Sequence, residues 1–325
     1  MSRKDPNSPA QPTDWSSGST SVHRRNRIVV GSSTSISSRN AVVWAAAEAE
    51  RYRAGLHIVH AYPLPQLGQP MQHDVDDLLR NEASVLLDRI ADNARRDHPN
   101  LDITTRLIHG APVNALRDES VDATLTVVGA KESGRLAGAI LGSIASAIAA
   151  VNPAPVAVIH PDHQANGRGP VVVGIDGSGG NSAAIKFAFA EASVRNTGLS
   201  AVYAWNESVI EGSLHDNPSL LDPAAIEQEE TAALSETLAG WCEMYPDVVV
   251  AHEVRRGRPA SVLQEFTASA SVMVVGRRSR GEFEALVMGS TSRSLMAHSS
   301  CPVVIVRSVH TDHPDRRIGA LLPIR

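Results

Sequence analysis

The sequence contains two similar halves, and this internal repeat constrains the fold more than any single motif. The stretch RIVVGSS (27–33) has the pattern of VVVGID (171–176), and Ser33 aligns with Asp176 at an offset of 143 residues. Beyond Gly110-Ala111-Pro112, which matches Gly257-Arg258-Pro259, the offset is 147 residues. Landmarks in these registers are Trp44 with Phe187, Glu48 with Glu191, Ala61 with Ala204, Gly129 with Gly276, Gly142-Ser143 with Gly289-Ser290, and Pro155 with Pro302. Such a constant register indicates a duplicated domain.

Each half alternates short apolar runs with helical patterns. The helical segments 41–55 and 181–198 end in Gly55 and Gly198, which we expect to cap them. Continuous β-branched runs are typical of parallel strands covered on both faces, and their alternation with helices implies right-handed crossovers. We therefore predict an α/β protein of two tandem doubly wound domains, each with a five-stranded parallel sheet. The expected strands are 27–31, 56–61, 103–108, 124–128 and 155–159, then 170–175, 199–204, 248–254, 271–275 and 302–306.

Polar segments suggest where the domains begin and end. We expect a disordered N-terminal tail (1–25), a first domain (26–160), a linker (161–169), a second domain (170–307) and a C-terminal tail (308–325). The N-terminal tail lacks the apolar region of a signal peptide, and the chain has only two cysteines, so we expect a cytoplasmic protein. A net charge of −5 and the lack of a bilayer-length apolar run argue against nucleic-acid and membrane partners.

Glycines follow several of the expected strands. In open α/β sheets, ligands bind beyond the carboxyl ends of the strands, where Gly31, Gly129, Gly174 and Gly276 lie. Gly289-Ser290 precedes a helix, whose first N–H groups suit a phosphate. The alternative is that Ser290 only caps a helix that begins near Thr291, and the residues alone leave both interpretations open. The sequence contains neither GxxxxGK[ST] nor GxGxxG, which excludes a P-loop NTPase and disfavours a dinucleotide enzyme.

The motifs of both halves resemble those of the universal stress protein family. The second half carries VVVGIDGS (171–178), GRP (257–259), VVG (274–276), Gly289-Ser290 and CPVVIV (301–306). The first half carries VVG near 28–31 and at 127–129, GAP (110–112), Gly142-Ser143 and APVAVI (154–159). The resemblance covers nearly all of 26–307 and implies a tandem protein of the kind common in actinobacteria, with a role in the stress or dormancy response.

The ATP-binding branch of that family carries a loop of the form G-x2-G-x9-G-[ST]. The second half matches at Gly276, Gly289 and Ser290 but has Ser279 at the second glycine. The first half matches at Gly129, Gly142 and Ser143 but has Glu132 there. The resemblance further implies nucleotide contacts by Asp176, Ala204, Val275, Arg278 and Thr291, with Gly31, Ala61 and Val128 in the first half. Asp176 has an alternative role as a helix cap or Asx-turn residue.

The two halves are not expected to bind ATP equally. The second half keeps Asp176, where the first has Ser33, and adds Arg277, Arg278 and Arg280 to the loop. The first half places Glu132 beside the expected triphosphate, where like charges repel, and keeps Lys131 as a base. The resemblance therefore implies that the second half holds the nucleotide, with Mg²⁺ accompanying its phosphates.

The sequence offers no convincing set of catalytic residues. HExxH and CxxC metal motifs are absent, and no histidine stands beside a recognisable nucleophile. We therefore expect a regulatory ATP-binding protein with unidentified protein partners and at most weak ATPase activity. A nucleotide-independent interaction scaffold and a slow ATP-hydrolysing enzyme are the alternatives.

The last strand of each half would lie at a sheet edge. PVAVIH (155–160) and PVVIVR (302–307) are apolar, and an exposed apolar edge promotes association. The family pairs such edges, so we expect these two strands to pair within the chain and form a pseudo-dimer. A homodimer remains an alternative that the sequence leaves open.

Overall fold

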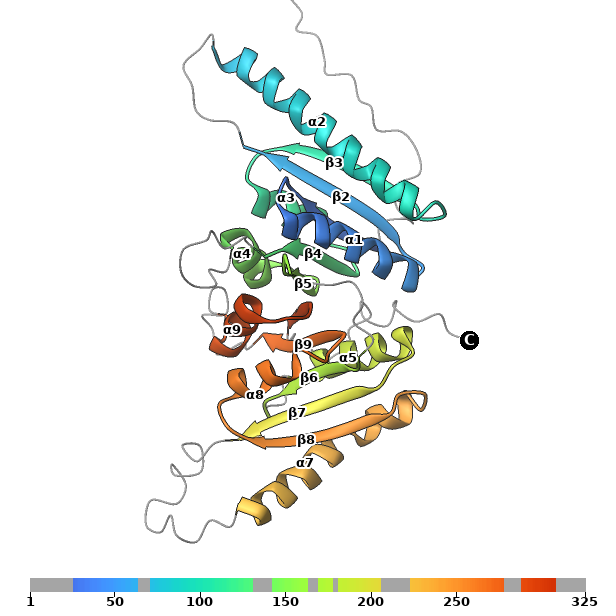
Figure 1. Cartoon of the computed structure of the whole chain (residues 1–325), viewed down its shortest axis with the longest axis vertical. Helices are drawn as coiled ribbons and strands as arrows, with labels where there is room; N and C mark the ends of the chain where they lie inside the picture. Colours follow the sequence, from blue (N-terminus) through green and yellow to red (C-terminus); the bar gives the residue numbers. More distant parts are fainter. Residues whose placement is uncertain are drawn as a thin grey trace, which may run out of the picture.

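A computed structural model describes residues 26–63, 71–130, 142–162, 169–177, 181–205, 223–277 and 288–307 (Figure 1). The expected tails, the loop residues Lys131 and Glu132, and Arg278, Ser279 and Arg280 lie outside these ranges, as does most of the expected linker. The domain boundaries therefore stay predictions. In the described ranges, no helix is both long and apolar enough to cross a membrane.

Both halves have the same order of elements. The first half contains β1 (Arg27–Ser32), α1 (Ile36–Arg51), β2 (Gly55–Tyr62), α2 (Met71–Asp97), β3 (Ile103–His109), α3 (Pro112–Glu119), β4 (Leu125–Gly129), α4 (Ser143–Val151) and β5 (Val156–Ile159). The second half contains β6 (Val171–Ile175), α5 (Ser182–Arg195), β7 (Leu199–Trp205), α7 (Pro223–Met244), β8 (Val250–Arg256), α8 (Pro259–Phe266), β9 (Val272–Arg277), α9 (Ser290–His298) and β10 (Val303–Arg307). The predicted strands are therefore present, with ends that differ by at most two residues.

The strands form one continuous ten-stranded sheet, in the order β3-β2-β1-β4-β5-β10-β9-β6-β7-β8. Within each half the strands are parallel, and strand order reverses between β1 and β4 and between β6 and β9. The predicted doubly wound fold is confirmed.

The predicted pairing of the two edge strands is also confirmed. Strands β5 and β10 run antiparallel, with Ala157 opposite Val304 at the centre of the pairing. Both residues are fully buried. The pairing turns the apolar edges into the centre of the sheet, so the chain forms an intrachain pseudo-dimer.

Alternate residues of the strands pack on opposite faces of the sheet, as the pleat requires. Ile28 and Val30 belong to a cluster with α1, α2, α5 and α7, whereas Val29 belongs to a cluster with α3, α4, α8 and α9. Each cluster contains buried residues from both halves, so the two domains share a core on each face of the sheet (Figure 1).

The expected glycine caps of α1 and α5 are wrong. Gly55 is the first residue of β2, and Gly198 directly precedes β7. The left-handed residues after these helices are Arg53 (φ 50°) and Asn196 (φ 52°). Asn tolerates this conformation better than most residues, but we have no local explanation for Arg53.

Candidate functional site

A cavity lies at the carboxyl ends of β1, β2 and β4, where the strand order of the first half reverses. Its volume is about 130 Å³, and its lining includes Gly31, Ala61, Val128 and Gly129, four of the residues predicted to contact nucleotide. Ile144, which follows the predicted residues Gly142 and Ser143, also lines it. The first-half prediction therefore falls on a real cavity at the position where α/β sheets bind ligands.

Hydroxyl groups dominate the polar lining of this cavity. Ser32, Ser33, Ser35 and Ser38 all contribute, and the Ser33 backbone N–H donates to Ser38 Oγ at 2.7 Å. His60 Nδ1 lies 2.9 Å from the Ser32 carbonyl oxygen, and burial lowers the pKa of this histidine. The described lining is therefore neutral and suits a sugar or a base better than a phosphate.

The second half brings most of its predicted residues to the matching strand ends. Ile175 pairs with Tyr203, so Asp176 and Ala204 follow them on adjacent strands, and Val275 pairs with Gly174. Tyr203 stands where the first half has His60; its pKa is raised by burial and then by the negative charges of Glu230 and Asp176. Gly276 lies near the end of β9, and Gly289, Ser290 and Thr291 lie at the start of α9, whereas Arg278 and Ser279 lie beyond the described end of β9.

The start of α9 does not agree with the hypothesis that Ser290 is the N-cap of this helix. The N-cap is Gly289, no side-chain hydrogen bond caps the helix within the described ranges, and Ser290 is already helical. The helix begins with the bond from the Arg293 N–H to the Gly289 carbonyl at 3.1 Å. That alternative is therefore wrong, and the first-turn N–H groups stay available to a ligand.

The first turns of α4 and α9 differ in their side chains. Helix α9 opens with three hydroxyl residues, Ser290, Thr291 and Ser292, and the last lies 3.4 Å from the Gly276 carbonyl. Helix α4 has the same Gly N-cap, Gly142, but opens with Ser143 and then Ile144 and an alanine. The second half therefore surrounds its helix start with more hydrogen-bonding groups.

Some of the predicted glycines are also required by packing. A Cβ atom on Gly129 would lie 2.6 Å from backbone atoms of Ser37 and Ser38, at the start of α1. A Cβ on Gly276 would lie 2.7 Å from Asn181 Oδ1. These glycines let the starts of α1 and α5 approach β4 and β9, so their presence alone does not identify a phosphate site.

Arg277 does not occupy the loop position that the sequence suggested. It is the last residue of β9, is 9% exposed, and donates from Nη1 to the Ala149 carbonyl of α4 at 3.4 Å. It therefore helps to join the two halves. Among the described residues, no group of three or more metal-ligating side chains occurs.

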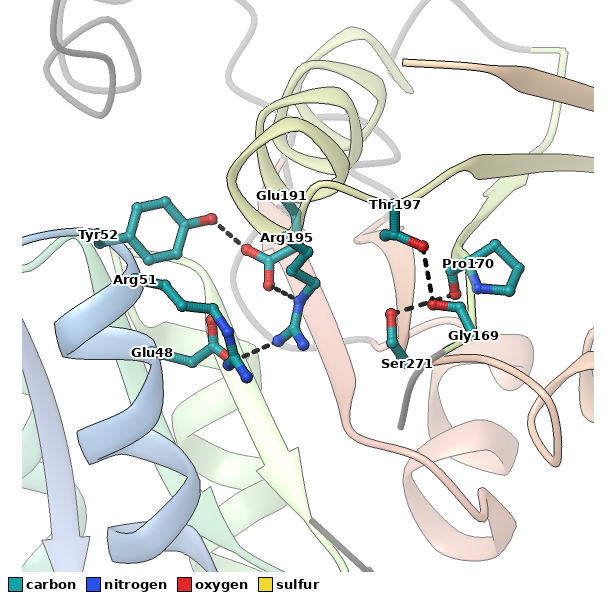
Figure 2. Close-up of polar contacts among 9 residues, drawn as sticks. All are labelled: Glu48, Arg51, Tyr52, Gly169, Pro170, Glu191, Arg195, Thr197 and Ser271. Atoms are coloured by element: carbon teal, nitrogen blue, oxygen red, sulfur yellow. Dashed lines mark hydrogen bonds and ion pairs between the residues drawn. The ribbon is translucent and has the colours of Figure 1, made fainter. Parts of the chain in front are cut away.

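Sequence reasoning missed a buried polar cluster between the halves. Tyr52 of α1 donates to Glu191 of α5, and Arg195 of α5 donates to Glu48 of α1 (Figure 2). Tyr52 and Arg195 occupy matching positions of the repeat, as do the two glutamates. The reciprocal contacts follow from the pseudo-two-fold symmetry. The aligned glutamates on apolar helices were the signal that could have revealed this cluster.

The cluster holds two carboxyl groups in a site almost without solvent. Arg195 also donates to Glu191 at 2.5 Å, and Arg51 donates to Glu48 at 2.6 Å. Burial, followed by the negative charge of Glu191, raises the pKa of Glu48 to about 8, although Arg195 and Arg51 oppose the shift. The same surroundings raise the pKa of Tyr52, so its hydroxyl keeps the proton that it donates.

Comparison with known proteins agrees with the repeat and the fold. The model described as "Universal stress protein family" matches residues 24–160 and 167–307. Universal stress protein Rv2005c of Mycobacterium tuberculosis is 35% identical over 301 residues, covering 87% of this chain and 98% of the relative. Rv2623 of the same organism is 33% identical over 293 residues, covering 86% and 96%.

Solved structures of similar proteins include both tandem-length and single-domain examples. A universal stress protein from Archaeoglobus fulgidus is 16% identical, covers 88% of this chain and 99% of its own, and has a TM-score of 0.66, which shows the shared fold. A universal stress protein solved in complex with cAMP is 32% identical, covers 42% of this chain and 97% of its own, and has a TM-score of 0.33. From the two family matches and the full-length relatives, the chain belongs to the universal stress protein family, with two such domains in tandem.

Proposed function

We propose that this tandem universal stress protein is an ATP-binding regulatory protein of the stress or dormancy response, with the nucleotide held mainly by the second half. The observation that carries the proposal is the start of α9. Among the described residues no side chain caps the first-turn N–H groups, and Ser290 and Thr291 add two hydroxyl groups to that turn, whereas the Ser292 hydroxyl bonds to the Gly276 carbonyl. A phosphate needs such donors and the positive end of the helix dipole.

Asp176 supplies the second part of the proposed site. A carboxylate accepts hydrogen bonds from two ribose hydroxyls, whereas Ser33 at the matching position has one hydroxyl that already donates to Ser35 Oγ. Mg²⁺ keeps most of its water shell when it accompanies ATP, so a single nearby carboxylate is enough to contact it through water. We assign no residue as a general base, so ATP acts here as a signal read by protein partners, with slow turnover at most.

The test compares matched positions of the two halves in the full chain. Asp176→Ala should weaken ATP binding by roughly tenfold to a hundredfold, the scale of lost hydrogen bonds to a charged group, whereas Ser33→Ala should change it little. Binding is measured by titration calorimetry and by the ATP-induced rise in melting temperature. Preserved affinity in Asp176→Ala with loss in Ser33→Ala would place the nucleotide in the first half.

A second pair of variants tests the helix start without disturbing the fold. A Cβ on Gly289 meets no atom within 4 Å of the described structure, and serine is a favourable N-cap. Gly289→Ser should therefore preserve stability while its hydroxyl competes with phosphate for the first-turn N–H groups. The control is Gly142→Ser in the first half. Absence of any ATP effect in the unmodified protein would favour the nucleotide-independent scaffold.

A further inference from the structure

A second hollow lies between α1 and α2 of the first half. Figure 1 shows these two helices on the same side of the sheet. Its volume is about 540 Å³, within the range of roughly 300–1,000 Å³ typical of small-molecule sites. Val42 and Ala46 of α1 and Ile90 and Ala94 of α2 contribute apolar walls. We call this hollow the α1–α2 groove. It is larger than the cavity at the ends of β1, β2 and β4, and Ser33 is the one residue that lines both.

The matching helix pair of the second half shows what fills such a space. Ala46 corresponds to Phe189 at the offset of 143 residues, and Ala94 and His98 correspond to Trp241 and Tyr245 at 147 residues. Phe189 stacks on Trp241 with ring centroids 6.3 Å apart and contacts Tyr245 at 5.6 Å. Three aromatic rings thus join α5 to α7, whereas the first half has two methyl groups and an imidazole.

Hydrogen bonds confirm that these positions are structurally equivalent. The His98 N–H donates to the Ala94 carbonyl at 2.9 Å, and the Tyr245 N–H donates to the Trp241 carbonyl at 2.9 Å. The buried residues also match, since Leu87 and Leu234 are each 4% exposed. The α1–α2 groove is therefore a place where the second half fits three aromatic rings and where the first half supplies only the imidazole of His98.

The charge around the groove is also reversed between the halves. Arg89 and Arg96 line the groove, and the matching residues of α7 are Glu236 and Glu243. Arg39 adds a third guanidinium, and Asp97 is the carboxylate in the lining. Among the described residues, none of these three arginines forms an ion pair with a carboxylate. Arg39 and Arg96 donate instead to neutral groups, the Thr34 carbonyl and Asn93 Oδ1.

We propose that the α1–α2 groove is a second small-molecule site, selective for a planar aromatic anion. The ring system takes the space that Phe189 and Trp241 occupy in the second half, and the arginines pair with its carboxylate, sulfonate or phosphate group. The proposal does not depend on ATP binding, because the groove lies on the helical face and not at the strand ends.

The probe is anilinonaphthalene sulfonate, an aromatic anion whose fluorescence rises in apolar surroundings, titrated against the full chain in the presence of saturating ATP. The uncharged phenylnaphthylamine is the matched probe without the sulfonate. We expect one sulfonate dye to bind per chain at the groove. The neutral dye should bind at least about tenfold more weakly, the scale of one charge-assisted hydrogen bond.

Substitutions that introduce the matching residues of the second half test where the dye binds. Ala94→Trp fills the groove, and the double variant Arg89→Glu with Arg96→Glu reverses its charge at exposed positions. Each should weaken binding of the sulfonate dye by about tenfold or more. The control is Arg95→Glu on the same helix, which makes the charge change of one of these two substitutions but does not line the groove. At moderate salt its effect should stay within about twofold.

The results of these variants decide whether the dye binds in the α1–α2 groove. If Ala94→Trp disturbs the fold, seen as a lowered urea midpoint, the exposed double variant alone decides the question. Unchanged dye affinity in the double variant would overturn the proposal. Equal weakening in Arg95→Glu and in the double variant would also overturn it, because the effect would then be a general one of net charge.

Discussion

Replacing Glu48 with glutamine should leave the free energy of unfolding nearly unchanged near pH 4, raise it by roughly 3 kcal/mol at neutral pH, and remove part of its pH dependence. The Glu48 side chain is fully buried between the halves, and its Oε2 has no hydrogen-bond partner among the described residues. A negative charge on that oxygen is costly, which is why burial raises the pKa of Glu48 to about 8. The folded protein therefore carries a proton there at neutral pH, and glutamine is neutral with nearly the same shape.

The sign of the pH effect follows from this raised pKa. An unfolded chain ionises the Glu48 carboxyl near 4.5, so the folded state binds one more proton between that value and about 8. Its contribution to stability is complete below the unfolded pKa and is lost as pH rises through the folded pKa. Each pH unit in that window changes the free energy of unfolding by up to about 1.4 kcal/mol, so the loss between about pH 6 and about pH 9 is roughly 2–3 kcal/mol.

The assay is urea unfolding of the wild type and of Glu48→Gln across that pH range. The difference in free energy between the two proteins should shift in favour of the variant by roughly 2–3 kcal/mol as pH rises. Glu236→Gln, at an exposed position of α7, is the control and should follow the wild type. A cost of about 3 kcal/mol or more for Glu48→Gln at pH 7 would refute the reasoning, because Glu48 would then be an ionised partner of Arg51 and Arg195.

Three further outcomes are expected from other parts of the structure. Arg195→Met removes the guanidinium that contacts both buried glutamates and should cost about 3–5 kcal/mol of unfolding free energy in urea; a cost below about 1 kcal/mol would contradict this. Gly257 has φ 153°, so Gly257→Ala should lower the free energy of unfolding by about 1–3 kcal/mol, measured by thermal unfolding. Gly240→Ala in α7 should instead raise it by about 0.5–1 kcal/mol. Similar shifts for both variants would contradict the argument. Amides of β5 and β10 should exchange with solvent only through global unfolding, and fast exchange there would mean that the halves separate readily.

The sequence predicted the fold well because the relevant signals are local and repeated. Apolar runs next to glycine or proline mark the strands inside the sheet, and the repeat gives two examples of each strand. The edge strands β3 and β8 have mixed sequences, ITTRLIH and VAHEVRR. Pairing of β5 with β10 followed from one physical requirement, that an apolar edge must be covered. Ala157 and Val304, both fully buried, lie at its centre.

Other features depended on contacts that no local pattern contains. Arg277 looked like part of a basic loop, yet it reaches the Ala149 carbonyl of the other half because β9 lies near the centre of the joined sheet. Gly129 and Gly276 look like ligand-binding glycines, yet the helices packed against them also require the missing side chain. The α1–α2 groove depends on how α1 and α2 pack, and the alanines Ala46 and Ala94 carry no local signal for a hollow between these helices.

Joining two domains in one chain also permits asymmetry that a symmetric dimer of one domain does not have. In such a dimer both subunits carry the same residue at each position. A tyrosine at the position of Tyr52 would therefore occur twice, and neither of these two positions would supply a guanidinium to the two buried glutamates. In the tandem chain, Tyr52 stands in one half and Arg195 in the other. Arg195 then contacts both carboxyl groups, and burial keeps a proton on Glu48 although Arg51 also donates to it, as the raised pKa of Glu48 indicates. The same freedom allows aromatic rings to close the outer helix pair of the second half while the pair in the first half stays open.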